Sequence, residues 1–274
     1  MRRLLDLIRL VRLHNVAAAV LSVAVGYGIA SNGMASWILL AGVATATAGG
    51  YVINDIEDRD IDMINKPFRP LPSGAVTPRA AWALYLFCVI ATCISTMWLS
   101  LVQTIWLGSW VILLHLYSVM LKRIYLAGNI LVALVSASGL LLGAHAGGNI
   151  WAGAVPALLA FFFSIGRELV KDTEDIAGDK ACGARTVPIV FGKIGTLRIS
   201  SLIFWALIIA FQLPWIIGGY GAFYAVIVAS TVVPILAVSA WLSWRGRSLG
   251  RVSGLLKLGM FCGILAFYFG PRGL

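Results

Sequence analysis

The stretch from Ser200 to Trp244 reads SSLIFWALIIAFQLPWIIGGYGAFYAVIVASTVVPILAVSAWLSW and contains no acidic or basic residue. An α-helix needs about 20 consecutive, mainly apolar residues to cross the hydrocarbon core of a bilayer. The stretch is therefore long enough for two crossings, and the pair Gly218-Gly219 near its middle is typical of a tight turn between helices. The sequence predicts two membrane-spanning helices here.

The same pattern covers most of the chain. Three further stretches, 15–31, 37–53 and 80–115, contain no Asp, Glu, Lys or Arg. Of the 274 residues, 60% are hydrophobic and only 12% are charged, which is about half the charged fraction of a typical soluble domain. Because unpaired backbone groups are costly in lipid, the expected structure is a helical bundle. We predict an all-α, polytopic membrane protein with nine transmembrane helices, at residues 13–32, 34–53, 80–100, 103–121, 125–146, 151–170, 196–217, 220–243 and 252–270.

The basic residues predict the orientation of this bundle. Lys and Arg gather at the N-terminus and in the connections 54–79, 122–123, 167–198 and 245–257, which all lie on one side of a nine-helix arrangement. Basic residues mark the cytoplasmic face, so we expect the N-terminus and these connections to be cytoplasmic and the protein to lie in the cell (plasma) membrane. The formal net charge of +10 is then a consequence of topology, and we do not expect nucleic-acid binding.

Ten of the 11 acidic residues fall in two short segments, 55–62 and 168–179, each at the end of a predicted span; only Asp6 lies elsewhere. Residues 54–62 read NDIEDRDID, and residues 172–179 read DTEDIAGD. Both segments have aspartates at i, i+3 and i+7 with Glu before the middle one, a spacing that puts three carboxylates on one helical face. The matched aspartates are Asp55, Asp58 and Asp62 in the first motif and Asp172, Asp175 and Asp179 in the second.

Carboxylates on one face repel one another unless something offsets their charge. Mg²⁺ does so, because it binds carboxylate oxygens and completes its shell with water and phosphate oxygens. Two such faces across a cavity would hold a diphosphate through bridging metal ions. One acidic segment alone is equally well interpreted as a solvated loop, but two matched segments favour a metal site. We expect them to form two Asp-rich cytoplasmic loops.

At these residues the sequence resembles the UbiA superfamily of intramembrane prenyltransferases. Members share an N-D-x-x-D-x-x-x-D motif after the second helix and a D-x-x-D-x-x-x-D motif after the sixth, which 54–62 and 172–179 match. Tyr117 and Lys122 match a Tyr–Lys element after the fourth helix. The resemblance covers the whole chain, which we interpret as a single domain, 1–274, and the matched motifs favour an internal repeat.

The resemblance implies that a prenyl group moves from its diphosphate to an acceptor through an allylic carbocation, with Mg²⁺ as cofactor. Asp55, Asp58, Asp172 and Asp175 would be catalytic. One Mg²⁺ would be held by Asn54, Asp55, Asp58 and Asp62, and the other by Asp172, Asp175 and Asp179. Arginine and lysine are expected to bind the phosphates. The predicted substrate-binding residues are Asn54, Lys66, Arg69, Tyr117, Lys122, Arg167, Lys171 and Arg185.

The acceptor is predicted from three stretches, 65–74, 117–129 and 166–188. They are similar to the branch of the family that moves a geranylgeranyl group from geranylgeranyl diphosphate to geranylgeranylglycerol phosphate in ether-lipid synthesis. An alternative is prenylation of an aromatic quinone precursor, although the Arg-Thr and Tyr-Pro pairs typical of hydroxybenzoate transferases are absent from 63–66 and 117–118. A more remote alternative is a cation-coupled transporter. Transporters place charged residues near the middle of the membrane, whereas these acids cluster at one face.

Overall fold

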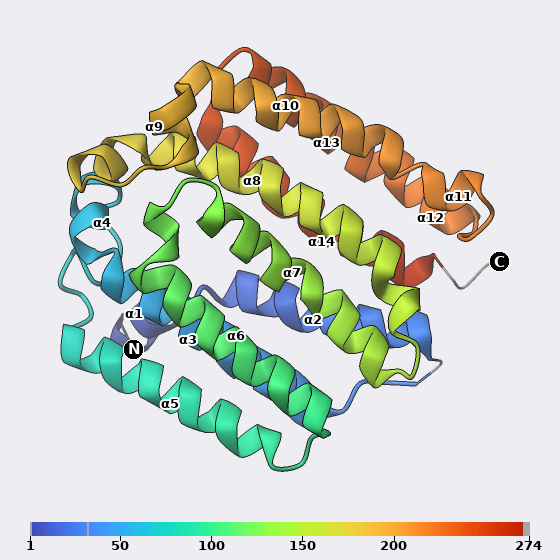
Figure 1. Ribbon diagram of the computed structural model, residues 1–274, viewed down its shortest axis with the longest axis horizontal. Coiled ribbons are helices and arrows are strands. Elements are labelled where there is room, and N and C mark those ends of the chain that lie inside the picture. Colours follow the sequence, from blue (N-terminus) through green and yellow to red (C-terminus); the bar gives the residue numbers. More distant parts are fainter. Residues whose placement is uncertain (1, 32, 271–274) are drawn as a thin grey trace.

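The computed structural model describes residues 2–31 and 33–270, and within these ranges the chain is helical with no β-strand. Nine helical segments of the described chain are long and apolar enough to cross a membrane, which confirms the predicted number. The last residue of the first predicted span, 32, lies outside the described residues. The long helices run roughly side by side, with α2 and α14 behind α7 and α8 in the view of Figure 1.

The spans are built from α-helices with short helical turns between them. The helix bounds are α1 (Arg2–Val11), α2 (Leu13–Ala30), α3 (Trp37–Glu57), α4 (Arg59–Asn65), α5 (Pro78–Thr96), α6 (Leu101–Val119), α7 (Ala127–Ala146), α8 (Ala154–Ala181), α9 (Val187–Phe191), α10 (Lys193–Ala210), α11 (Leu213–Ile216), α12 (Ala222–Ile227), α13 (Val233–Trp244) and α14 (Leu249–Phe269). The 3₁₀ turns η1 (Leu121–Arg123) and η2 (Ile150–Gly153) precede α7 and α8, and a π-helical turn, η3 (Val228–Val232), joins α12 to α13.

Both aspartate motifs are helical, so the prediction of two motif loops was wrong. The second motif lies within α8, which continues to Ala181 instead of ending near residue 170. The first motif spans the end of α3 and most of α4, with only Asp58 between the two helices. The contacts described below explain why: basic side chains offset the charge of the carboxylates and amide side chains donate hydrogen bonds to them, so like-charge repulsion does not end the helices.

Close packing of α2 against α7 depends on glycine. A Cβ atom built on Gly26 would lie 2.1 Å from the carbonyl oxygen of Leu140, and one built on Gly143 would lie 2.0 Å from the carbonyl oxygen of Val23. Small residues allow helix backbones to approach in membranes, where no hydrophobic effect drives helices together. These two glycines therefore set the distance between α2 and α7, which both line the cavity described below.

Among the described residues, buried apolar side chains form one large cluster, mainly between the later helices, and three smaller clusters between earlier elements. Phe204, Phe211 and Leu236 belong to the large cluster, whereas Leu107 and Trp110 belong to one of the smaller clusters. Phe211 and Trp110 line the same cavity, so this cavity lies between these two clusters.

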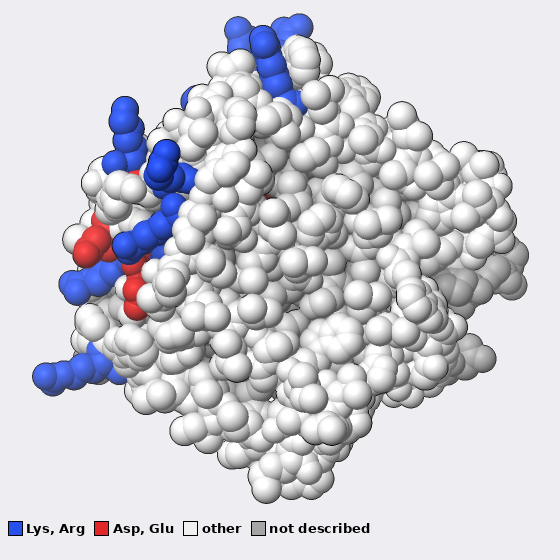
Figure 2. All heavy atoms as spheres, in the orientation of Figure 1, with Lys and Arg blue, Asp and Glu red and all other residues white. Residues whose placement is uncertain are grey.

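The charged residues gather at one end of the bundle. In Figure 2 the lysine and arginine side chains in view occupy the left and upper parts of the face and the acidic side chains lie mainly at the left, whereas none of the described residues in view at the right-hand end is charged. Figure 1 places α4 and α9 at the left-hand end and the α11–α12 connection at the right-hand end. The two aspartate motifs therefore lie at the charged end of an otherwise apolar molecule.

Candidate active site

Two arginines contact the first motif, one that precedes it in the sequence and one that follows it. Asp55 lies in the last turn of α3, accepts a hydrogen bond from the guanidinium of Arg12 and is only 3% exposed. Arg69 Nη1 lies 2.5 Å from Asp62 Oδ2 and 3.6 Å from Asp55 Oδ1, so one guanidinium serves two carboxylates. Burial raises the pKa of Asp62 above its ordinary value although Arg69 opposes the shift. For this carboxylate the effect of burial on the pKa is larger than that of the contact with Arg69.

The middle aspartate of the first motif has different partners. Asn54 Nδ2 donates to Asp58 Oδ2 at 2.7 Å, one helical turn along. Lys122 Nζ, from the turn after α6, lies 2.7 Å from Asp58 Oδ1, and its side chain is 8% exposed. The carbonyl oxygen Oδ1 of Asn54 is buried and has no hydrogen-bond partner. A buried acceptor without a donor is costly, and a bound cation would satisfy it.

The second motif takes its partners from distant parts of the chain. Asn129, near the start of α7, donates to Asp172 Oδ2 at 2.7 Å. Lys66 Nζ lies 2.5 and 2.6 Å from the two carboxylate oxygens of Asp175. Asp179 lines the same cavity as Asp172 and Asp175. The second motif is therefore held partly by the segment that follows the first.

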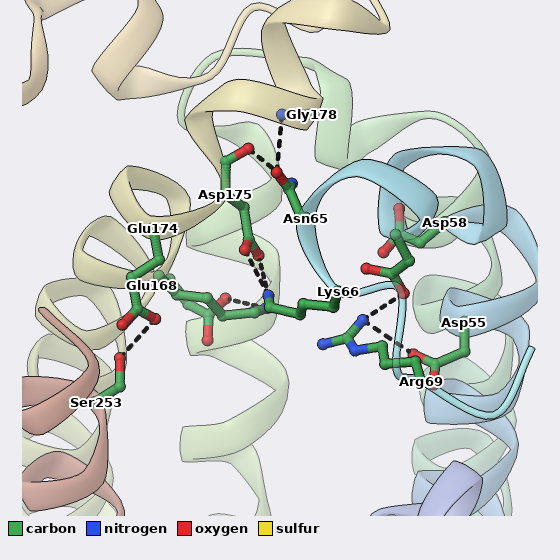
Figure 3. Close-up of polar contacts among 12 residues, drawn as sticks. Asp55, Asp58, Asn65, Lys66, Arg69, Glu168, Glu174, Asp175, Gly178 and Ser253 are labelled. Carbon is green, nitrogen blue, oxygen red and sulfur yellow. Dashed lines mark hydrogen bonds and ion pairs between the residues drawn. The ribbon is translucent and has the colours of Figure 1, made fainter. Parts of the chain in front are cut away.

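Asn65 joins the two motif helices through its amide (Figure 3). Its Nδ2 donates to the carbonyl oxygen of Asp175, and its Oδ1 accepts from the backbone N–H of Gly178, both at 2.9 Å. A Cβ atom on Gly178 would lie 2.5 Å from Asn65 Nδ2. Only glycine allows this close contact, and together with Lys66 it fixes the end of α4 against α8.

Two cavities meet at this end of the bundle. The smaller, about 50 Å³, is lined by Asp58, Asp62, Asp172, Asp175 and Asp179 together with basic residues. The larger, about 180 Å³, is lined mainly by apolar side chains of the membrane-spanning helices. Four residues line both cavities, so the two spaces are neighbours. They are Arg12, Asn54, Tyr117 and Lys171.

The donor set fits Mg²⁺, although the aspartates are held by protein groups. Within residues 2–31 and 33–270 no three His, Cys, Asp or Glu side chains lie close enough together to hold a metal ion. Five of the motif aspartates nevertheless face one small cavity, and Asn54, whose Oδ1 has no hydrogen-bond partner, lines it too. Hard carboxylate and amide oxygens are the ligands Mg²⁺ prefers. Small movements of the lysine and arginine side chains away from the carboxylates would expose this set.

The structure brings most predicted site residues together. Asn54, Tyr117 and Lys122 line the small cavity with the aspartates, Lys66 and Arg69 contact the aspartates directly, and Lys171 lines both cavities. Arg167 lines only the larger cavity. Arg185 does not join them: it is exposed, it lines neither cavity, and its backbone N–H donates to the carbonyl oxygen of Arg123.

Sequence reasoning missed three residues that contact the motifs or the cavity. Arg12 was assigned only to the basic N-terminal group, although it follows an amphipathic segment at the start of the first span. Asn129 is a polar residue at the start of an apolar span, and such residues usually have a specific partner. Glu168 is buried in a membrane-spanning segment and was noted only as one of the acids. The polar or charged character of these residues in apolar surroundings was the available signal.

The fold and this site define a class: a polytopic helical membrane protein with an acid-rich pocket beside an apolar cavity. The sequence profile of the UbiA prenyltransferase family matches residues 19–265, and the chain belongs to this family. It is a membrane-embedded prenyltransferase.

Relatives with curated names cover nearly the whole chain. The digeranylgeranylglyceryl phosphate synthase of Methanopyrus kandleri is 38% identical over 97% of this chain and 98% of its own. The enzyme of the same name from Halobacterium salinarum is 37% identical over 82% of this chain and 80% of its own.

Solved structures agree in fold. A structure described as digeranylgeranylglyceryl phosphate synthase superposes with a TM-score of 0.74 and 29% identity, covering 99% of each chain. A UbiA homolog from Archaeoglobus fulgidus bound to GPP and Mg²⁺ superposes with a TM-score of 0.67, covering 96% of this chain and 99% of its own. At 18% identity this second likeness concerns the fold alone.

Proposed function

We propose that the protein transfers a geranylgeranyl group from geranylgeranyl diphosphate to geranylgeranylglycerol phosphate and so forms an ether lipid. The observation that carries the proposal is the pairing of an acid- and base-lined cavity with a larger apolar one, joined through Arg12, Asn54, Tyr117 and Lys171. A diphosphate in the small cavity and its hydrocarbon chain in the large one would use both spaces. The names of the curated relatives support this choice of substrates.

We infer that Mg²⁺ is the cofactor. Asn54, Asp55, Asp58 and Asp62 would hold one ion, and Asp172, Asp175 and Asp179 the other. When bound, the ions neutralise the diphosphate and help it leave. Asp55, Asp58, Asp172 and Asp175 are the residues we propose as catalytic.

The basic residues have a second role in this proposal. Lys66, Arg69 and Lys122 contact the motif aspartates. If the aspartates held Mg²⁺, these ammonium and guanidinium groups would be free to donate to the phosphate oxygens. Their donors then stabilise the negative charge that develops on the departing diphosphate. The carbocation left behind is attacked by a hydroxyl oxygen of the acceptor, which forms the ether bond and releases the hydroxyl proton.

We also propose that the charged end of the bundle faces the cytoplasm, with the protein in the plasma membrane. Basic connections are retained on the cytoplasmic side of multi-span proteins. The gathering of lysine and arginine at the end that holds α4 and α9 supports this orientation.

The test is a transfer assay with purified protein in detergent, Mg²⁺ and labelled geranylgeranyl diphosphate. Geranylgeranylglycerol phosphate and 4-hydroxybenzoate are offered in parallel. We expect label in the glycerol phosphate lipid. Label found only in the aromatic acid would support prenyl transfer but refute the proposed acceptor.

A further inference from the structure

The basic residues near the two cavities fall into two groups. Lys122 pairs with Asp58 and Arg69 pairs with Asp62, and both line the small, acid-rich cavity. Arg167 is different, because it lines only the larger cavity, and Lys171 extends into both. The position of Arg167 is therefore not explained by the binding of the diphosphate and its metal ions, and Lys171 lies between Arg167 and the small cavity.

Glu168 holds these two basic residues in place. Arg167 Nη1 donates to Glu168 Oε1 at 2.9 Å, and Lys171 Nζ donates to Glu168 Oε2 at 3.1 Å. Glu168 is 2% exposed and is the one carboxylate that lines the larger cavity in the described part of the chain. The guanidinium and the ammonium group are thus fixed side by side at the wall of an otherwise apolar space.

The charge balance differs between the two cavities. Five aspartates and five basic residues line the small cavity, so metal ions are needed there before a diphosphate is bound. In the larger cavity Glu168 faces Arg167 and Lys171, and Arg12, which also lines it, is paired with Asp55. Three basic residues thus meet two carboxylates, which leaves an excess of one positive charge. A phosphate monoester carries about −1.5 to −2 charges near neutral pH. The larger cavity therefore has a positive excess, of the sign that a monoester needs, without any metal ion.

We propose that Arg167, Lys171 and Arg12 form a second, metal-independent anion site that binds the phosphate of the lipid acceptor; this rests on the proposed function. Arg12 and Lys171 also line the small cavity, so a phosphate bound here lies next to the diphosphate pocket. The acceptor hydroxyl is only a few bonds from its phosphorus atom, which brings it to the boundary between the cavities. The hydrocarbon chain of the acceptor extends along apolar walls that include Phe163 and Phe211.

The first test compares two acceptors, geranylgeranylglycerol phosphate and the same lipid without phosphate. We expect the wild type to prefer the phosphorylated acceptor in kcat/KM. In Arg167→Met and in Lys171→Met this preference falls by about tenfold to a hundredfold, because a charge-assisted hydrogen bond to the phosphate is lost. Lys171→Arg, which keeps the charge, restores part of it.

The matched control is Lys66→Met, which removes a cation from the small cavity. This variant lowers the transfer to both acceptors by the same factor, so the preference for the phosphorylated acceptor does not change. Preference unchanged in both Arg167→Met and Lys171→Met overturns the proposal. A purely structural role of these residues would lower kcat/KM for both acceptors by the same factor, and this result also overturns the proposal.

The second test needs neither turnover nor a variant. Binding of the two lipids to the wild-type protein is measured by native mass spectrometry in excess EDTA. We expect the phosphorylated lipid to bind more tightly than the alcohol, while geranylgeranyl diphosphate loses most of its affinity. Equal binding of phosphorylated and unphosphorylated lipid in EDTA overturns the proposal. If the phosphorylated lipid is preferred but only 4-hydroxybenzoate is prenylated, the anion site stands and the proposed function fails.

Discussion

The two aspartate motifs have the same spacing but different supports. The first is divided between α3 and α4 at Asp58, whereas the second lies on the unbroken α8. The first is neutralised by three cations, of which Arg12 comes from the junction of α1 and α2. The second depends on the amide of Asn129 for one aspartate and on Lys66 for another.

Because of this difference, the two motifs do not depend on each other to the same extent. Lys66 and its neighbour Asn65 follow the first motif directly, yet their side chains contact the second. A change at the end of α4 therefore disturbs both motifs, whereas a change on α8 disturbs one. The predictions below test this inequality, beginning with a treatment that affects both motifs equally.

Removal of divalent metal gives the largest expected effect. Both sets of carboxylates serve the metal ions in the proposed mechanism, so excess EDTA abolishes prenyl transfer and added Mg²⁺ restores it. The measurement is transfer of labelled geranylgeranyl groups before EDTA, after EDTA and after Mg²⁺ is returned. Full activity in EDTA would remove the metal-based mechanism for both motifs.

Substitution of the middle aspartates separates the two motifs. Asp58→Asn and Asp175→Asn each lower kcat by about 10² to 10³, the effect of losing a group that stabilises charge in the transition state. Each has a matched control one residue before it, Glu57→Gln and Glu174→Gln. Neither glutamate lines the small or the larger cavity, and Glu174 instead accepts a hydrogen bond from Ser253 at 2.7 Å (Figure 3).

The controls should stay within a few-fold of the wild type in the same transfer assay. A well-folded Asp58→Asn variant with normal turnover contradicts the metal site. If both glutamate controls lose as much activity as the aspartate variants, the general acidity of the segments matters and the spacing of the aspartates does not.

Substitution at the end of α4 has an intermediate expected effect on activity. Asn65→Ala removes both amide contacts to α8, and each lost hydrogen bond costs about 0.5–1.5 kcal/mol. We expect kcat to fall about tenfold, since each 1.36 kcal/mol in the barrier is a factor of ten. The spans do not depend on this contact, so the thermal unfolding midpoint changes little. If the loss of activity is fully accounted for by a loss of folded protein, Asn65 has no positioning role.

The sequence predicted the spans well, because nearly all the information is local. Twenty apolar residues and a turn signal suffice for the pair in Ser200–Trp244, and the matched spacing identified both motifs. The partners of the aspartates were harder to predict. Asn129 and Asp172 are far apart in sequence, and only the packing of α7 against α8 brings them together.

The helical state of the motifs was missed for a related reason. A row of aspartates on one face predicts repulsion, and the sequence does not show which cations reach them. Lys66 Nζ, at the end of α4, lies 2.5 Å from a carboxylate oxygen of Asp175 on α8. This contact offsets the like-charge repulsion that would favour a loop. Basic residues near the membrane surface look alike in sequence, although Lys122 is buried at Asp58 and Arg185 is exposed.

Substitution of Arg185 has the smallest expected effect. It tests whether the place of a residue in the sequence motif or its position in the structure decides its role. It follows the second motif much as Arg69 follows the first, but Arg69 contacts two aspartates and Arg185 lines neither cavity. Arg185→Ala should therefore keep kcat/KM for geranylgeranyl diphosphate within about threefold, or roughly 0.7 kcal/mol. Arg69→Ala in the same assay should lose at least tenfold, because Asp55 and Asp62 lose their shared cation. Equal losses in the two variants would mean that Arg185 reaches the bound diphosphate after all, and the supports of the two motifs would then be alike.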